Sequence, residues 1–234
     1  MAMATSSAST STFQATSQTS KKPKAVKKVL VIKKIGDSSL LSPFVQLVRW
    51  LIEEKFMVVF VEPSVMEDAV LQSNRDFDRV QEKLVTFQDS DDLTEKIDLI
   101  ICLGGDGTLL YASYLFQKSV PPVIGFHLGS LGFLTPFKFD KFEKQINNVL
   151  EGRGALMLRS RLRCEIVRGH EQNPSKPPMD HVVLNDIVID RGLSPYLSNI
   201  DLFINGKQIT SVQGDGLIVS TPTGSTAYAV AAGA

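Results

Sequence analysis

Apolar and polar residues in the first part of the chain form blocks typical of strands and helices in turn. Apolar residues predict strands at 26–35, with 29–32 as the buried centre, and at 57–61, 97–103 and 123–126. In 97–103 successive positions are apolar, which is typical of a buried strand of a parallel sheet. Ser42 and Pro43 predict the N-cap and first residue of a helix. Its apolar stripe is Phe44, Leu47, Val48, Leu51 and Ile52. Residues 67–87 are more polar and predict a connecting helix or lid, followed by a short strand. This β-α-β-α order predicts an α/β fold with a parallel sheet.

The pattern changes after a further predicted helix at 139–152. Strands are predicted from there on at 161–167, 182–189, 199–204 and 207–211. Asn205 and Gly206 predict a hairpin between the last two, since a type I′ turn needs positive φ at both central residues. The polar, proline-containing segment 169–180 predicts an exposed loop. We therefore expect three parts: a disordered segment at 1–25, an α/β domain at 26–155 and a β-rich domain at 156–234.

Composition narrows the class of partner. Lysine and arginine number 25, as do aspartate and glutamate, which gives no indication of nucleic acid or of an anionic membrane. Two distant cysteines indicate a reducing compartment, and no apolar run is long enough to span a bilayer. The start of the chain, rich in Ser, Thr, Ala and Gln, has neither the arginines of a transit peptide nor an apolar secretory core. The lysine-rich run 21–28 is a weak targeting patch or a solvated lead-in to the first strand. We expect a cytoplasmic protein.

The most informative stretch is where the apolar run 97–103 stops at glycines and a helical pattern begins at Thr108. A strand that turns into a helix presents backbone N–H groups to phosphate oxygens, and Gly104, Gly105 and Gly107 allow close approach and positive φ. Asp106 cannot help to bind a phosphate without a metal, so it indicates a metal-bridged nucleotide or a base for a hydroxyl. An ordinary tight turn with aspartate as a turn residue is the alternative.

A second Gly-Asp-Gly sequence starts at Gly214. It leads through an apolar strand at 217–219 into small hydroxyl residues and a helix predicted from Ser225 or Thr226. Capping hydroxyls and free amides there suit ribose or phosphate, although an ordinary capped helix is the alternative.

Asn185 and Asp186 lie inside an otherwise apolar predicted strand. Unless its polar groups are hydrogen-bonded, such a pair destabilises the strand by roughly 1–3 kcal/mol per group. Either a bulge directs both side chains into a pocket, or the pair lies at the surface of an edge strand.

Together these residues carry a clear resemblance to the NAD kinase family. The four blocks are GGDGTLLYAS at 104–113, FHLGSLGFLTPF at 126–137, LNDIVIDRG at 184–192 and QGDGLIVSTPTGSTAY at 213–228. Their order and spacing match the family, and the resemblance runs from about residue 26 to the last residue. A GGDG turn alone is shared with diacylglycerol and sphingosine kinases and with phosphofructokinases, whereas the four blocks in order are highly specific. The residues within the four blocks are most similar to those of the animal-type cytosolic enzymes.

The resemblance implies a Rossmann-like parallel α/β domain followed by an all-β domain, which is incomplete in this chain. It implies transfer of the γ-phosphoryl group of ATP to the 2′-hydroxyl of the adenosine ribose of NAD, giving NADP, with Mg²⁺ accompanying ATP. Asp106 would be the base, and no protein residue is assigned to a metal. The phosphate loop would be Gly104, Gly105, Gly107 and Thr108. The NAD-binding residues would be Asp106, Gly107, Asn185, Asp186, Asp215, Thr223, Thr226, Ala227, Tyr228 and Ala231.

The chain departs from the family pattern in three places. Gln213 stands where many bacterial members carry a basic residue, and Ala231 where they carry serine. The family also continues beyond Ala234, so we expect a fragment or a truncated variant of an enzyme that forms a homo-oligomer when full-length. Two alternatives remain at this point: a lipid kinase of the GGDGT type, and a non-catalytic chain that binds nucleotide or full-length subunits.

Overall fold

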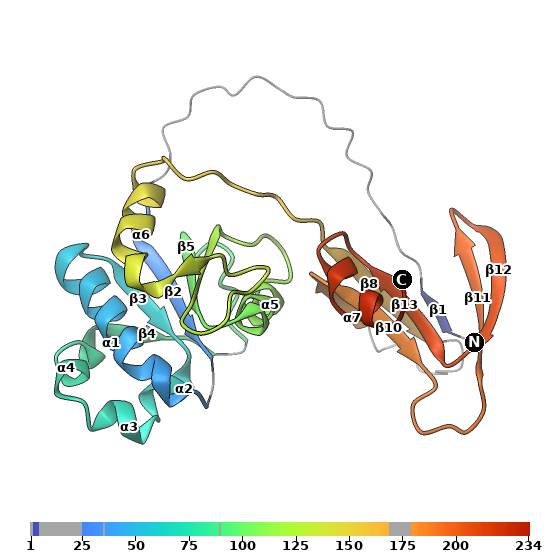
Figure 1. The fold of residues 1–234 in the computed structure, drawn as a ribbon, viewed down its shortest axis with the longest axis horizontal. Helices are drawn as coiled ribbons and strands as arrows, with labels where there is room; N and C mark the ends of the chain where they lie inside the picture. The colour runs from blue at the N-terminus through green and yellow to red at the C-terminus, as the bar shows by residue number, and fades with distance from the viewer. Residues whose placement is uncertain (1, 5–24, 35, 89, 169–178) are drawn as a thin grey trace. The chain divides into compact units, whose positions relative to one another are not determined.

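The computed structural model describes residues 2–4, 25–34, 36–88, 90–168 and 179–234. The chain divides into two compact units, residues 13–157 and residues 158–234 with the start of the chain. The first is an α/β unit and the second is built mainly of strands (Figure 1). A parallel-sheet α/β domain followed by a β-rich domain is the predicted fold class, and it is confirmed.

The α/β unit is built on one six-stranded sheet in the order β4-β3-β2-β5-β6-β7, with all neighbouring strands parallel. The chain first adds β3 and β4 on one side of β2, then adds β5, β6 and β7 on the other side. Open sheets of this order bind ligands beyond the carboxyl ends of the strands, at the point between β2 and β5 where the direction reverses. The strands are β2 (Lys28–Lys33), β3 (Val58–Val61), β4 (Leu84–Thr86), β5 (Leu99–Leu103), β6 (Val123–His127) and β7 (Phe137–Lys138).

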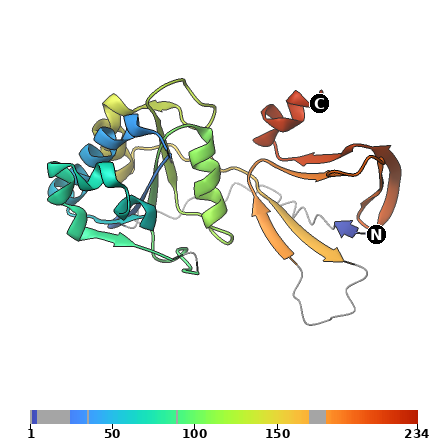
Figure 2. The ribbon, with the colours of Figure 1, turned by 90° about the horizontal axis from the view of Figure 1, so that it is seen from below.

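Helices cover both faces of this sheet. Figure 2 shows α5 (Asp106–Leu115), in light green, on one face, and α1 (Leu41–Arg49) and α6 (Phe142–Leu150) on the other. The residues of β2 alternate accordingly: Val29 and Val31 belong to the core with α1 and α6, whereas Leu30 and Ile32 belong to the core on the α5 side. Because both faces are buried, the strands read as unbroken apolar runs.

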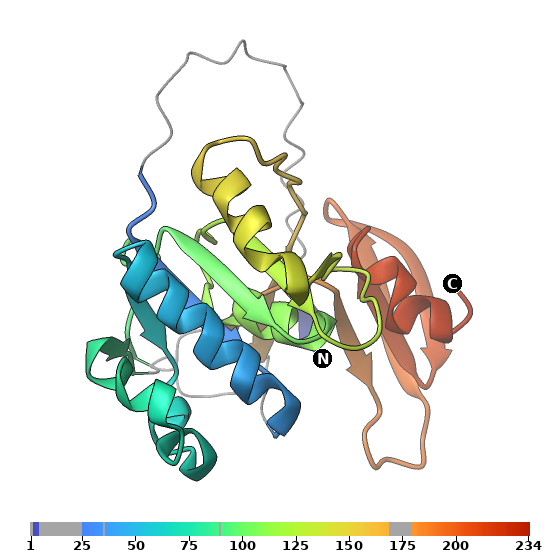
Figure 3. The same ribbon diagram turned by 60° about the vertical axis from the view of Figure 1, so that its left-hand side comes forward.

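The predicted start of α1 is wrong. A short 3-10 helix, η1 (Ser38–Leu40), precedes it, and the Asp37 side chain accepts the backbone N–H of Ser39 at 3.2 Å. Ser42 is therefore not an N-cap: it lies inside the first turn of α1, and the residues before it are already helical. The helix extends into a π-helical segment, η2 (Trp50–Glu54), and Figure 3 shows it beside α6 on the near face of the sheet.

The connecting segment between β3 and β4 contains several short helices, not one. They are α2 (Pro63–Met66), α3 (Ala69–Gln72), α4 (Arg75–Asp78) and the 3-10 helix η3 (Gln81–Lys83). Asp68 and Asn74 break the segment because their side chains accept backbone N–H groups and so start α3 and α4. The predicted short strand follows as β4. The later helix is likewise divided, into η4 (Phe139–Lys141) and α6.

The β unit contains three small antiparallel sheets, β1-β8-β9, β10-β13 and β11-β12. Asn205 and Gly206 join β11 to β12 with φ of 51° and 76°, which confirms the predicted hairpin. Two short helices, η5 (Gly224–Thr226) and α7 (Tyr228–Ala231), follow the last strand. The strands are β1 (Ala2–Ala4), β8 (Leu162–Arg168), β9 (Met179–Val183), β10 (Asp186–Asp190), β11 (Ser198–Ile204), β12 (Lys207–Gly214) and β13 (Gly216–Ser220).

Three predictions for this unit need correction. The single strand expected at 182–189 is two strands separated by a bend at Leu184 and Asn185, because β9 pairs with β8 whereas β10 pairs with β13. The predicted loop at 169–180 ends earlier, since β9 begins at Met179, and its residues 169–178 lie outside the described part. Within the segment 1–25, for which disorder was expected, residues 2–4 form β1 and pair with β8, while residues 5–24 lie outside the described part.

Candidate functional site

The loop after β5 lies at the switch point of the sheet. The helix α5 begins at Asp106, two residues earlier than predicted, with Gly105 as its N-cap. Gly104 has φ of +148°, and a Cβ there would collide with the Thr108 hydroxyl and lie 3.1 Å from the Cβ of Lys34, just beyond β2. A Cβ on Gly105 or Gly107 would meet nothing within 4 Å. Gly104 therefore fixes a close approach of two loops, while the other two glycines leave open space beside the helix start.

The Asp106 carboxylate is held by the segment after β6. Its Oδ2 accepts the backbone N–H of Phe133 at 2.9 Å, and its Oδ1 accepts the N–H of Leu134 at 2.8 Å. The Thr135 hydroxyl donates to Oδ1 at 3.4 Å. A Cβ on Gly132 would collide with Asp106 Oδ1 and with Thr135 Oγ1, so only glycine fits there. Two of the four sequence blocks thus meet at this carboxylate, which is fixed in one orientation.

Two buried polar residues at the same edge of the sheet were not predicted. Glu62, which directly follows β3, is 7% exposed and accepts a hydrogen bond from the Tyr111 hydroxyl at 2.8 Å. His127, at the end of β6, is 5% exposed, and its Nδ1 lies 3.0 Å from the Gly129 carbonyl oxygen. The available signal was their position, because each is a titratable residue at the carboxyl end of a buried strand.

In the β unit, Asn185 lies at the bend between β9 and β10 beside the segment after β13. Its carbonyl oxygen accepts the N–H of Thr221 at 2.8 Å, and a Cβ on Gly224 would lie 2.7 Å from the Cα of Asn185. The buried side-chain oxygen of Asn185 has no hydrogen-bond partner among the residues that the structure describes. Asp186 begins β10 directly opposite Ser220. The structure therefore shows a bend at Asn185, whereas Asp186 is already the first residue of β10.

Thr221 organises this region, and sequence reasoning missed its role. Its hydroxyl donates to the Leu184 carbonyl oxygen at 2.6 Å and accepts the N–H of Gly224 at 3.0 Å. Thr223 is 7% exposed and accepts a hydrogen bond from Arg159 Nη1 at 3.2 Å. The capping hydroxyl was expected at Ser225 or Thr226, but both lie within η5, and the Ser225 hydroxyl donates to the Pro222 carbonyl oxygen at 2.8 Å.

The remaining candidate residues lie along the last segment. Tyr228 begins α7 and is 53% exposed, Ala231 ends it, and Thr226 and Ala227 immediately precede it. Asp215 is different: it precedes β13, at the end of the β10-β13 ladder away from Asp186, and its side chain is 81% exposed. Its carboxylate pairs with Arg191 Nε at 2.6 Å. The structure thus groups Asn185, Asp186 and Thr223 but separates Asp215 from them along the ladder.

No group of three or more His, Cys, Asp and Glu side chains that could hold a metal ion occurs in the described part of the chain. Within the same residues, every helix is too short or too polar to cross a membrane.

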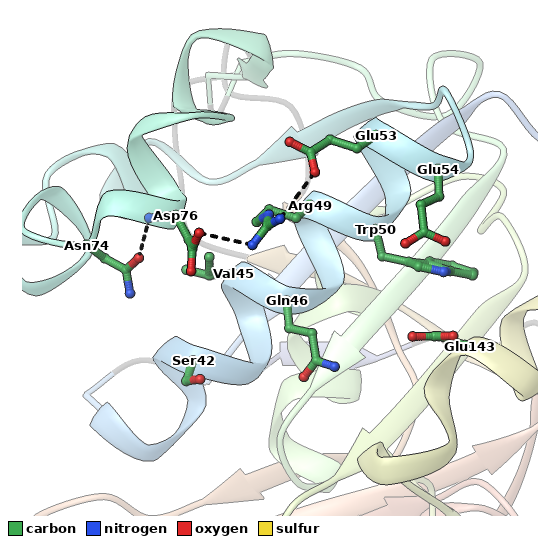
Figure 4. Close-up of a pocket in the computed structure, with 10 residues that line it drawn as sticks. All are labelled: Ser42, Val45, Gln46, Arg49, Trp50, Glu53, Glu54, Asn74, Asp76 and Glu143. Atoms are coloured by element: carbon green, nitrogen blue, oxygen red, sulfur yellow. Dashed lines mark hydrogen bonds and ion pairs between the residues drawn. The ribbon is translucent and has the colours of Figure 1, made fainter.

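A hollow of about 390 Å³ lies elsewhere in the α/β unit, over α1, η2 and α4 (Figure 4). Its lining carries the carboxylates of Glu53, Glu54, Asp76 and Glu143. The one guanidinium, that of Arg49, already pairs with Asp76 at 3.0 Å and with Glu53 at 3.5 Å. An excess of carboxylates repels phosphate, and none of the predicted site residues lines this hollow.

A parallel sheet of this strand order, with a glycine-rich loop and a fixed carboxylate at its switch point, is an open α/β fold of the kind that binds ligands such as nucleotides at that point. Family models place the chain more narrowly. The ATP-NAD kinase N-terminal domain matches residues 29–154, and the ATP-NAD kinase C-terminal domain matches residues 184–234. The chain belongs to the NAD kinase family.

Individual relatives agree. The chain is 46% identical over 213 residues to the probable NAD kinase 2, chloroplastic, of Oryza sativa subsp. japonica, covering 88% of this chain and 21% of that protein. It is 37% identical over 229 residues to the NAD(+) kinase of Saccharomyces cerevisiae, covering 89% and 42%. Among solved structures it resembles yeast NADH kinase complexed with NADH, with a TM-score of 0.78, 33% identity and coverage of 90% of this chain and 62% of that one. The chain therefore spans less than half the length of the two curated relatives.

Proposed function

We propose that this chain carries the active-site residues of an ATP-dependent NAD kinase, which transfers the γ-phosphoryl group of ATP to the 2′-hydroxyl of the adenosine ribose of NAD. The observation that carries the proposal is the fixed Asp106 carboxylate in the glycine-rich loop at the switch point of the sheet. The family match supports this reaction over the phosphorylation of a lipid, the alternative left open by the GGDGT sequence alone.

In this proposal Asp106 is the general base. An alkyl hydroxyl is a poor nucleophile, so a carboxylate within hydrogen-bond reach takes its proton as the new phosphorus–oxygen bond forms. The bond between the γ-phosphorus and the β,γ-bridging oxygen breaks in the same transfer, and ADP leaves. The hydrogen bonds from Phe133 and Leu134 orient the carboxylate before the substrate arrives. Open space at Gly105 and Gly107, beside the start of α5, suits the triphosphate.

The acceptor is proposed to bind through Asn185 and Asp186, with Thr223, Thr226, Ala227, Tyr228 and Ala231 beside them. The unpartnered side-chain oxygen of Asn185 supports this role, because a buried acceptor without a donor costs stability unless a ligand supplies one. Asp215 is proposed to contact the dinucleotide as well, in which case its ion pair with Arg191 must rearrange or share the carboxylate.

The divalent cation, Mg²⁺, is proposed to arrive with the ATP phosphates as part of the substrate. Isolated carboxylates fit such a role, since Mg²⁺ keeps several waters and takes one or two carboxylates plus phosphate oxygens. Among the described residues, Asp106 supplies a carboxylate at the loop, and no group of three or more possible ligands occurs.

The test is an assay of the purified chain with ATP and Mg²⁺, with NAD in one arm and NADH in the other, measuring NADP and NADPH. Formation of NADP that disappears in Asp106→Asn supports the proposal. Nucleotide binding without product supports the alternative of a non-catalytic chain that binds nucleotide or full-length subunits.

We also propose that the chain comes from a cytoplasmic enzyme of the animal-type group, because the residues of its four motif blocks are closest to that group, and that the full-length form is a homo-oligomer, as the resemblance to the family implies. One of its relatives is named as a chloroplastic enzyme, so the location of a tagged protein in cells is the direct test. Light scattering on the purified protein measures the oligomeric state.

A further inference from the structure

Glu62 is a buried carboxylate for which the proposed reaction has no role so far. It follows β3 at the carboxyl edge of the sheet and is 7% exposed. Although it is the N-cap residue of α2, its side chain makes no hydrogen bond to that helix. Its Oε1 accepts a hydrogen bond at 2.8 Å from the hydroxyl of Tyr111, 49 positions further along the chain. One phenol uses a fraction of the acceptor capacity of a carboxylate, which can accept about four hydrogen bonds.

The register of the sheet places Glu62 on the same face as the loop after β5. Phe60 contributes to the core on the α5 side, and Glu62 follows it by two residues, so it continues that face. Leu30 pairs with Phe60, and extending this register places Glu62 level with Ile32 of β2. Ile32 in turn pairs with Cys102, two residues before Gly104. Glu62 therefore lies two strands from the glycine-rich loop, on the face of the sheet that α5 covers.

The helix that begins at Asp106 also fixes Glu62. Tyr111 lies in α5, five residues after Asp106, so one rigid helix links the fixed carboxylate at the loop to the carboxylate at the end of β3. A helix rises 1.5 Å per residue, so the backbone positions of Asp106 and Tyr111 are about 7–8 Å apart along the helix axis.

We propose that Glu62 accepts hydrogen bonds from the ribose diol of the phosphoryl donor ATP, and that Tyr111 positions its carboxylate for this contact. The proposal rests on the proposed kinase function. A carboxylate at the end of the second strand of a sheet of this order is well placed for a ribose, since vicinal hydroxyls donate to its two oxygens together. Phosphates at the glycine-rich loop and a ribose at Glu62 would lie along one edge of the sheet.

The experiment measures binding of ATP, 2′-deoxy-ATP, 3′-deoxy-ATP and NAD to the full 234-residue chain by calorimetry. The variants are Glu62→Gln and, as the matched control, Glu67→Gln, which removes the same charge from an exposed position five residues away. Tyr111→Phe keeps the carboxylate but removes the hydroxyl that holds it. Thermal unfolding of each variant monitors the fold.

We expect the unmodified chain and Glu67→Gln to bind ATP about 10- to 100-fold more tightly than at least one deoxy analogue, as for a hydrogen bond to a charged group. Glu62→Gln should reduce this ratio to within about threefold and Tyr111→Phe should reduce it partly, while NAD affinity stays unchanged. If the role of Glu62 were purely structural, Glu62→Gln would weaken the binding of all four ligands together and leave the ratio of ATP affinity to deoxy-analogue affinity unchanged.

A ratio that survives Glu62→Gln overturns the proposal while leaving the kinase function standing. Weakened NAD binding with unchanged ATP binding overturns the assignment to the donor. An unmodified chain that binds neither ATP nor NAD overturns the kinase function itself, and this inference with it.

Discussion

The Asp106 carboxylate and the backbone N–H of Leu134 form a 2.8 Å hydrogen bond across 28 positions of the chain. With the neighbouring N–H of Phe133 on the other oxygen, it connects the glycine-rich loop to the segment after β6. The residue proposed as base is thus also a structural anchor, and a substitution there has two separable effects.

Asp106→Asn is expected to lower turnover by about 10²–10⁴-fold, because an amide cannot take the proton of the acceptor hydroxyl. Both carboxylate oxygens accept backbone N–H groups, and asparagine retains one acceptor oxygen, so we also expect a loss of about 0.5–1.5 kcal/mol in stability. NADP formation and chemical denaturation measure the two effects. Near-full turnover of a folded Asp106→Asn protein would contradict the base assignment.

Gly132→Ala is expected to destabilise the α/β unit by about 1–3 kcal/mol, as overpacking of a close contact does. The new methyl group would collide with Asp106 Oδ1 and Thr135 Oγ1, so activity should fall as well. Gly129→Ala is the matched control, because a Cβ at Gly129 meets nothing within 4 Å. Equal midpoints of unfolding for the two variants would show that the segment relaxes freely.

Asn185→Ala is expected to weaken the binding of NAD, while the stability of the folded chain stays unchanged or rises slightly. The substitution removes a buried oxygen that has no partner among the described residues, and an unsatisfied acceptor costs about 1–3 kcal/mol. Calorimetry with NAD and with ATP, beside thermal unfolding, checks this; Asp186→Ala should likewise affect NAD more than ATP. Lost ATP binding with intact NAD binding would assign the pair to the other substrate.

The two cysteines are expected to differ in reactivity. Cys102 in β5 has no exposed surface, and burial raises the pKa of its thiol to about 12, whereas Cys164 in β8 is partly exposed. A thiol-specific disulfide reagent should therefore modify one cysteine in the folded chain and both after denaturation. Cys164→Ser should abolish the reaction of the folded chain; a rapid reaction that persists in this variant would show that β5 opens.

Acid is expected to weaken the pairing of β8 with β9. The Arg163 guanidinium donates to both oxygens of Asp180, with Nη2 at 2.6 Å from Oδ2, and this hydrogen bonding lowers the pKa of Asp180 below its usual 3.8. The pair therefore stabilises the folded state above the unfolded pKa, and this contribution is lost as the pH falls through the lowered folded pKa. Thermal unfolding of the chain and of Asp180→Asn between pH 7 and pH 2 should show a steeper loss for the unmodified chain at the acid end. If the stability of the two proteins fell in parallel with pH, this pair would not contribute to the acid sensitivity.

Elements whose cause is local, or nearly so, are predictable from the order of residues. The apolar runs around Val29 and Ile100 predict buried strands. Asn205 with Gly206 predicts the hairpin, because both residue types readily adopt the positive φ that a type I′ turn needs. The four motif blocks likewise identify the family.

Contacts between distant groups are a property of the folded chain and are not predictable from the order of residues. Asp106 with Leu134, Glu62 with Tyr111, and Thr221 with Leu184 are contacts across 28 or more positions, set by strand register and by the path of loops. Periodicity records which face a residue occupies, but not which residue of another element lies against it. For the same reason the strand expected at 182–189 divides at Asn185: its two halves are equally apolar, but they pair with different strands.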